Sequence, residues 1–282
     1  ICLRYFFELI DKDGQSLYFG NYTFWEKRPK EISQMFDCPL KSKEEDRFLV
    51  PDWAKGKVVY QIFPDRFADG EKVNEKLWYD APVKNWRAMY GGNLRGIIEK
   101  IEYIKDLGVD IVYMTPIFLS GSNHKYDTTD YFTIDPGFGT KEDLKELVEK
   151  AHALGMYVIL DGVFNHTAPD FFAFKDLKKN GETSAYKDWY YPKNFPLKSH
   201  FGQKPNYLCF GYFGGMPKLN TSNKEVQKYI YDVVTYWMKE CKIDGWRLDV
   251  GDEISHSFWK WFRSEIKAFK EDVLIVGENW FY

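Results

Sequence analysis

Short apolar runs alternate with helical patterns over most of this chain. The strand-like runs lie at residues 58–62, 109–114, 156–160, 243–248 and 273–276. Apolar residues at helical spacing separate these runs at residues 94–107, 140–154, 222–237 and 257–269. Parallel strands need such crossovers, so the alternation predicts an α/β fold with a parallel sheet. Two architectures stay open: a doubly wound sheet of five strands, or the first five strands of an eight-stranded β/α barrel.

Two of the helical patterns begin with a polar residue that can cap a helix. Thr140 is followed by Asp143, and Ser222 is followed by Glu225, at the spacing of a capping box. We therefore expect helices to begin directly after Thr140 and directly after Ser222.

The first 50 residues have a different pattern. Two aromatic runs, residues 5–10 and 17–24, flank a turn signal at residues 11–14 (Asp-Lys-Asp-Gly), which predicts a β-hairpin. Two strands are only marginally stable alone, so we expect this segment to be the end of a β-domain or to pack on the α/β body. The predicted division is residues 1–50 for the β-domain and residues 51–282 for the α/β body.

One connection in the α/β body exceeds the usual length of about 2 to 6 residues. Residues 167–221 separate the third strand-like run from the helix that comes after it. Thirteen of the 43 residues from Phe171 to Phe213 are aromatic. We expect an inserted subdomain whose rings form a wall that faces sugars.

Charge and composition limit the partners. The chain has 39 basic and 42 acidic residues, so its net charge of −3 favours neither nucleic acid nor an anionic membrane as a partner. The longest apolar stretch falls short of the roughly 20 residues that span a bilayer. An aromatic content of 19% combined with this charge favours sugars over bases. No signal-peptide pattern is present at Ile1, which leaves the localisation open and favours the cytoplasm.

Polar side chains stand at the ends of three strand-like runs. The third run continues into Asp161, and period two places Arg247 and Asp249 on one face of the fourth. An arginine favours the ionised form of a neighbouring carboxyl, which a carboxylate nucleophile needs. Glu278 ends the fifth run, and strands about 4.8 Å apart allow two carboxyls to reach the separation of about 5 to 5.5 Å seen in retaining glycosidases. The alternative is a buried structural ion pair.

These strand ends resemble the signatures of the α-amylase family of glycoside hydrolases. Residues 161–166 (DGVFNH), 245–249 (GWRLD) and 277–279 (GEN) match those signatures in order. The resemblance covers residues 51–282 and implies a TIM-type (β/α)8 barrel, of which this chain contains the first five strands. It also implies that residues 167–221 are the subdomain inserted after the third strand.

The resemblance implies a retaining hydrolase of α-1,4 and also α-1,6 glucosidic bonds. Asp249 would be the nucleophile that forms a glycosyl-enzyme, and Glu278 would be the general acid and then the general base. Arg247 would keep Asp249 charged. No cofactor is expected for this chemistry.

Residues 216–220 (MPKLN) are similar to the signature of the neopullulanase, cyclomaltodextrinase and maltogenic amylase group. This narrower resemblance implies cyclomaltodextrins, pullulan or starch-derived oligosaccharides as substrates, without ranking them. It implies that residues 1–50 belong to an N-terminal β-domain that helps to build a homodimer. The implied substrate-binding residues are Tyr126, Asp161, His166 and Glu253.

The same resemblance predicts a structural calcium ion near the first strand of the barrel. Carboxylate, amide and carbonyl oxygens suit such a hard cation. The predicted ligands are Asp69, Glu71, Asn74, Glu75, Gly91 and Asn93. A solvated turn without a metal has the same composition.

Other activities share much of this pattern. An α-1,6-glucosidase or a glucanotransferase of the same family uses the same acid pair, and the MPKLN segment argues against both. A non-catalytic carbohydrate-binding relative would have no reason to retain Asp249, Glu278 and Arg247 together. The family's third acid and strands six to eight have no counterpart here, so we expect this chain to be part of a longer polypeptide.

Overall fold

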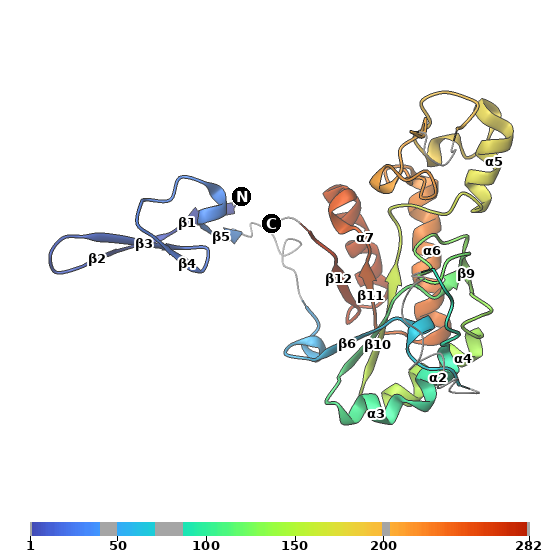
Figure 1. The fold of residues 1–282 in the computed structure, drawn as a ribbon, viewed down its shortest axis with the longest axis horizontal. Helices are drawn as coiled ribbons and strands as arrows, with labels where there is room; N and C mark the ends of the chain where they lie inside the picture. Colours follow the sequence, from blue (N-terminus) through green and yellow to red (C-terminus); the bar gives the residue numbers. More distant parts are fainter. Residues whose placement is uncertain (1, 40–49, 71–86, 199–203, 281–282) are drawn as a thin grey trace. The chain divides into compact units, whose positions relative to one another are not determined.

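The computed structural model describes residues 2–39, 50–70, 87–198 and 204–280 (Figure 1). The chain divides into two compact units, residues 1–50 and residues 51–280. Within the described residues, no helix is both long enough and apolar enough to cross a membrane.

The first unit is built from short antiparallel strands. Strand β1 (Cys2–Tyr5) pairs with β5 (Phe36–Pro39), and β2 (Phe7–Ile10), β3 (Ser16–Gly20) and β4 (Thr23–Trp25) form a three-stranded meander. The predicted hairpin is present as β2 and β3. The second predicted run is not one strand, because Asn21 and Tyr22 have positive φ angles of 46° and 59° and turn the chain back into β4.

The second unit contains a parallel sheet of five strands. Its order follows the chain: β6 (Val59–Ile62), β7 (Ile111–Met114), β10 (Tyr157–Gly162), β11 (Gly245–Leu248) and β12 (Leu274–Gly277). A doubly wound sheet reverses its order at a switch point, and this sheet does not. Sequential order is that of a β/α barrel. A separate two-stranded ladder joins β8 (Phe118–Leu119) and β9 (Asp130–Ile134).

The helices between these strands also contact one another in chain order. Helices α2 (Leu94–Glu99), α3 (Ile101–Asp106), α4 (Lys141–Ala153), α6 (Lys224–Cys241) and α7 (His256–Phe269) make successive contacts, α2 with α4, α4 with α6 and α6 with α7 (Figure 1). The helix predicted over residues 94–107 is two helices, because Lys100 leaves the helical region at ψ 8°. Short 3-10 helices lie at Ile32–Gln34, Asp52–Ala54, Pro64–Arg66 and Gly251–Glu253.

The two predicted helix starts have different outcomes. Thr140 and Asp143 form the predicted capping box. The cap predicted at Ser222 is wrong, since Asn223 accepts hydrogen bonds from the backbone N–H groups of Glu225 and Val226 at 2.7 and 3.2 Å. An asparagine side chain is an equally good cap, and it lies one residue further along.

Each face of the sheet has its own core. The helices cover one face with the larger apolar cluster, which includes Val112, Val158 and Trp246. On the other face, Ile111, Tyr113, Ile159 and Leu274 form a smaller cluster. Side chains alternate along a strand, so this inner face continues to residues 161, 247, 249 and 278 at the strand ends.

The insertion between β10 and α6 forms a small subdomain. It contains α5 (Phe172–Asn180) and 3-10 helices at Gly181–Thr183, Lys187–Trp189 and Phe210–Tyr212, and α5 lies at the opposite end of this unit from α3 (Figure 1). Five of its twelve described aromatic rings are buried, so these five cannot belong to the predicted wall that faces sugars. The buried rings that form its own core include Phe171, Phe174, Trp189, Tyr190 and Tyr207. Tyr212 and Phe213 are exposed.

Candidate active site

The register of three neighbouring strands brings the predicted polar residues together. Asp161 on β10 pairs with Arg247 on β11, and Leu248 pairs with Gly277 on β12. The backbone N–H of Glu278 donates to the Leu248 carbonyl at 3.0 Å, which continues the ladder beyond the strands. Asp249 donates its own N–H to the Gly162 carbonyl at 3.1 Å. These positions follow from parallel pairing alone.

One guanidinium holds all three carboxylates. Arg247 Nη1 lies 3.0 Å from Asp161 Oδ2 and 3.0 Å from Asp249 Oδ1, and Nη2 lies 2.8 Å from Glu278 Oε2. The exposed fractions of the side chains are 0% for Asp161, 7% for Asp249 and 25% for Glu278. Asp249 and Glu278 therefore lie within the span of one planar fork, and Glu278 is the more accessible.

Burial decides the protonation of the two aspartates. It raises the pKa of Asp161 to about 6, against the opposing effect of Arg247. It raises the pKa of Asp249 to about 8, and the negative charge of Asp161 adds to this rise. Arg247 was expected to hold Asp249 ionised. It does act in that direction, but burial and the neighbouring carboxylate outweigh it.

Glu278 has the opposite shift. Burial acts to raise its pKa, but hydrogen bonds from Val250 and Trp280 and the charge of Arg247 together lower it. The Val250 backbone N–H donates to Glu278 Oε2 at 3.0 Å. Val250 has φ 48°, a left-handed conformation that is costly for a β-branched residue. This strained turn directly after Asp249 aims a donor at the second acid.

Two tyrosines donate hydrogen bonds to Asp161. Tyr113 and Tyr126 each donate a hydroxyl hydrogen bond to Asp161 Oδ2, Tyr126 at 3.1 Å. Burial raises the pKa of both phenols, so both stay protonated as donors. Tyr113 was not predicted. Its position on the inner face of β7 is the signal that could have identified it, although an aromatic residue in an apolar strand is usually core.

His166 lies in the predicted cluster with both ring nitrogens engaged by protein. Nε2 lies 3.1 Å from the Tyr126 carbonyl, which can only accept, so Nε2 carries the proton. Nδ1 lies 3.4 Å from Asn165 Nδ2. Burial lowers the pKa of His166 to about 4, so the imidazole is neutral at pH 7. In this structure His166 fixes Tyr126, and it offers no unoccupied nitrogen to a sugar.

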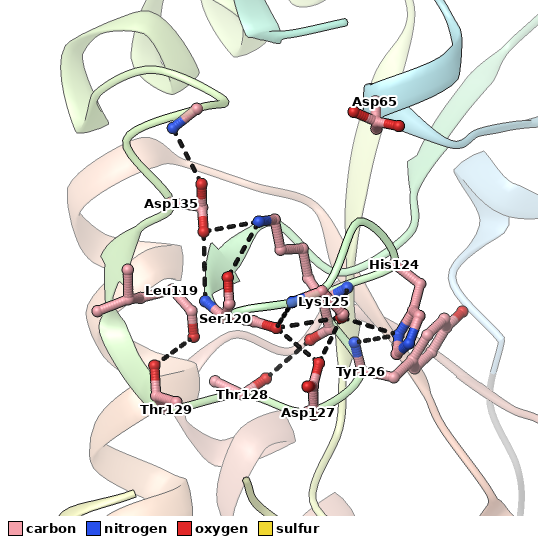
Figure 2. A network of polar contacts seen from close by, with 12 residues as sticks. Asp65, Leu119, Ser120, His124, Lys125, Tyr126, Asp127, Thr128, Thr129 and Asp135 are labelled. Carbon is pink, nitrogen blue, oxygen red and sulfur yellow. Dashed lines mark hydrogen bonds and ion pairs between the residues drawn. The ribbon is translucent and has the colours of Figure 1, made fainter. Parts of the chain in front are cut away.

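A buried lysine anchors the turn that carries Tyr126. Lys125 Nζ lies 2.7 Å from Asp135 Oδ2 and 3.1 Å from the Ser120 carbonyl, and its side chain is 3% exposed. Figure 2 shows the Lys125 side chain reaching toward Asp135, with the Tyr126 ring on the other side of the turn. Lys125 itself has a φ of 60°, in the left-handed region. Further bonds within the turn join Asp127 to Ser120 and Ser122.

Glu253 follows Asp249 in the Gly251–Glu253 3-10 helix. Its Oε2 pairs with Lys218 Nζ at 2.8 Å and accepts from Asn165 Nδ2 at 3.1 Å. The Glu253 side chain remains 37% exposed. Lys218 belongs to the segment that ends the insertion, and its role at the site was not predicted.

The predicted calcium ligands are described in part. Asn93 caps α2, where its Oδ1 accepts from the N–H groups of Gly96 and Gly70 at 2.9 and 3.3 Å. Asp69 Oδ1 and the Gly91 carbonyl both lie 3.5 Å from Asn93 Nδ2. Within the described residues, no group of three or more His, Cys, Asp or Glu side chains is arranged to hold a metal ion. The other predicted ligands lie outside the described residues: Glu71, Asn74 and Glu75.

The strand ends of a sheet in barrel order present three carboxylates around one arginine. This arrangement indicates the class of protein, and comparison with known proteins agrees with it. The family model of the alpha amylase catalytic domain matches residues 61–281. The chain therefore belongs to the alpha-amylase family. The predicted family and the predicted partial (β/α)8 barrel are both confirmed.

Within that family, the chain is similar to enzymes of one group. It is 49% identical to a cyclomaltodextrinase of Thermoanaerobacter pseudethanolicus over 98% of this chain and 48% of that protein. It is 44% identical to neopullulanase 2 of Thermoactinomyces vulgaris over 99% of this chain and 47% of that protein. A solved structure of a cyclomaltodextrinase aligns with a TM-score of 0.77 at 40% identity. The alignment covers 99% of this chain and 48% of that one. The chain thus spans about half the length of the curated relatives that it matches.

Proposed function

We propose that this chain carries the catalytic pair of a retaining α-glucan hydrolase that acts on cyclomaltodextrins, pullulan or starch-derived oligosaccharides. The observation that supports this most is the position of Asp249 and Glu278 on one guanidinium at the ends of adjacent strands. Two carboxyls that act on one glycosidic bond from adjacent positions are the arrangement of a retaining hydrolase. The substrates are those implied by the names of the relatives, cyclomaltodextrinase and neopullulanase.

In the proposed reaction, Glu278 gives its proton to the glycosidic oxygen while an oxygen of Asp249 attacks the anomeric carbon. The bond to the leaving sugar breaks, and an ester joins the remaining sugar to Asp249. Glu278, now ionised, takes a proton from water, and the resulting hydroxide displaces Asp249 and restores the acid. Each step uses only side chains of this chain and water, with no cofactor.

This reaction needs the proton on Glu278, whereas the pKa directions place it on Asp249 without substrate. The two acids share Arg247, so they titrate as a coupled pair. We propose that the sugar moves the proton. A sugar between the acids removes water from Glu278, which raises its pKa, and sugar hydroxyls that donate to Asp249 lower the pKa of that group.

The four predicted substrate-binding residues take different roles in this proposal. Tyr126 and Glu253 are partly exposed, so we propose that these two contact the sugar. Asp161 and His166 are buried and fully engaged by protein, so they hold Arg247 and Tyr126 in place instead. This division is supported by burial and by the bonds already occupied.

The test is hydrolysis by the complete natural polypeptide. Cyclomaltodextrins, pullulan and starch are supplied separately, and the released sugars are identified by chromatography. Product that first appears with the α-anomeric configuration in proton NMR supports retention. A folded protein that releases no sugar from any of the three substrates contradicts the proposal, and the ratio of the three rates ranks the substrates.

Two further parts of the proposal concern assembly and metal. Exposed apolar side chains in the first unit, including Phe7, Ile10 and Phe24, support a homodimer formed through residues 1–50. Sedimentation of the natural polypeptide with and without residues 1–50 tests this. We also propose a structural calcium ion beside Asn93, where the Asp69 carboxylate and the Gly91 carbonyl both lie. Identical unfolding midpoints in calcium and in chelator would contradict it.

A further inference from the structure

The ammonium of Lys218 is surrounded by three oxygens. Nζ lies 2.8 Å from Asn165 Oδ1, 2.8 Å from Glu253 Oε2 and 3.0 Å from the Glu253 carbonyl. An ammonium has three N–H donors, so each has an acceptor. All three donors have a protein acceptor although 21% of the Lys218 side chain is exposed. Its donors thus remain engaged at the edge of the site.

The three oxygens come from two segments that are distant in sequence from Lys218. Asn165 follows β10, and Glu253 follows β11. The backbone around Lys218 runs antiparallel to the segment after β10, with a bridge to His166 and a bond from the Leu219 N–H to the Asn165 carbonyl at 2.9 Å. The side chain then reaches across to the loop that follows Asp249. One charge therefore joins the end of the insertion to both strand ends.

Lys218 decides how Asn165 is oriented. An ammonium can only donate, so Asn165 must turn its oxygen toward Lys218 and its nitrogen away. That nitrogen then lies 3.1 Å from Glu253 Oε2 and 3.4 Å from His166 Nδ1. Asn165 is completely buried, so water cannot replace these partners. Lys218 therefore affects His166 indirectly, because it fixes which end of the Asn165 amide faces the imidazole.

Lys218 also restricts Glu253. Two donors, Lys218 Nζ and Asn165 Nδ2, hold the same carboxylate oxygen. Without them, a partly exposed glutamate would sample several rotamers. A carboxylate fixed in one rotamer binds a sugar hydroxyl without a further loss of conformational freedom.

We propose that Lys218 is a positioning residue, which holds Glu253 for the α-glucan and orients Asn165 toward His166. This inference rests on the proposed function. It deepens that function, because it names the side chain through which the insertion acts on substrate binding. Lys218 itself need not touch the sugar.

The experiment compares five forms of the complete natural polypeptide: wild type, Lys218→Met, Glu253→Gln, the double variant and Lys179→Met. Lys179 is an exposed lysine on α5 in the same insertion, so it controls for loss of a charge. On maltooligosaccharides, Lys218→Met should raise KM about tenfold, as expected for loss of a charge-assisted contact, and should change kcat less than about threefold. The double variant should resemble Glu253→Gln, because Lys218 acts through that residue. Lys179→Met should match the wild type.

A loss of kcat with unchanged KM, or effects of Lys218→Met and Glu253→Gln that multiply, would overturn the inference. An activity-independent measurement separates it from the proposed function. The nitrogen resonance of the unprotonated His166 Nδ1 should show a bond accepted from Asn165 Nδ2 in the wild type, and it should move toward the position of a free ring nitrogen in Lys218→Met. If the wild type degrades no glucan but this change is seen, the proposed function fails and the orientation by Lys218 stands. An unchanged Nδ1 resonance contradicts the orientation of Asn165 by Lys218 directly.

Discussion

The strand ends and the loops around them hold their functional residues in different ways. Asp161, Arg247 and Glu278 are placed by the register of paired strands, whose hydrogen bonds fix them before any side chain interacts. Tyr126 and Glu253 lie in loops that depend on lysines: Lys125 is fully buried against Asp135, and Lys218 is partly exposed. The comparison indicates that the sheet places the reacting groups, while loop ion pairs place the groups that surround the sugar.

The comparison predicts that strand-end variants lose rate without losing stability. Asp249→Asn should lower kcat by about 10⁴-fold or more, because an amide forms no glycosyl ester. Burial already raises the pKa of Asp249 to about 8, so this group is mostly protonated at pH 7 and a neutral amide replaces it closely. The unfolding midpoint should therefore stay unchanged. Steady-state rates and thermal unfolding measure the two effects.

Asp106→Asn, on the exposed surface of α3, is the matched control and should retain full activity. Near-wild-type turnover in Asp249→Asn would remove this residue from the chemistry. A large fall in the unfolding midpoint of Asp249→Asn would instead show that residues at the strand ends also contribute to stability.

A variant of Glu278 tests the second carboxylate at the strand ends. Glu278→Gln should lower kcat/KM on maltooligosaccharides by about 10² to 10⁴-fold, the usual contribution of a general acid. An aryl maltoside with a nitrophenol leaving group needs no proton for departure, so its first step should suffer far less. The rate of nitrophenol release under single-turnover conditions measures this step. Equal losses on both substrates would contradict the role of Glu278 as the acid.

The pH profile tests how the strand-end charges are coupled. In the free enzyme, kcat/KM should fall on the alkaline side near pH 8, where the acid pair loses its last proton. The negative charge of Asp161 raises the pKa of Asp249, so Asp161→Asn should lower that pKa and move the alkaline limb to lower pH. A rate loss of about 10 to 100-fold should accompany the shift, because Arg247 loses a partner. If the alkaline limb of Asp161→Asn stays in place or moves to higher pH, the coupling between Asp161 and Asp249 is contradicted.

The strand ends were predictable because their geometry is local. Period two placed Arg247 and Asp249 on one face, and the next strand supplied Glu278, before any tertiary contact was known. Tyr113 obeys the same rule, but a tyrosine in an apolar strand gives no sign that its hydroxyl meets a carboxylate.

The loop supports were not predictable for a physical reason. Lys218 acquires its role only where the segments of Asn165 and Glu253 meet, and no spacing in the sequence encodes that meeting. Lys125 stood next to a predicted residue, yet a charged side chain in a loop is ordinarily solvated. Its burial depends on a left-handed backbone angle and on Asp135, ten residues away.

Among the variants of Asp249, Glu278, Asp161 and Lys125, the Lys125 variant should have the smallest effect on rate and the largest effect on stability. Lys125→Met leaves Asp135 buried without its cation, which should lower the free energy of unfolding by about 3 to 5 kcal/mol. Activity of the folded fraction should fall only about tenfold, since Tyr126 loses its fixed turn but Asp249 and Glu278 keep theirs. Lys239→Met, an exposed lysine on α6, is the control. The double variant Lys125→Met, Asp135→Asn should recover stability, because the neutral amide removes the buried charge and its oxygen can still accept from the Gly137 N–H. If it recovers stability but not rate, the ion pair positions Tyr126; if it recovers both, the pair supports the fold alone and the distinction between the two regions weakens.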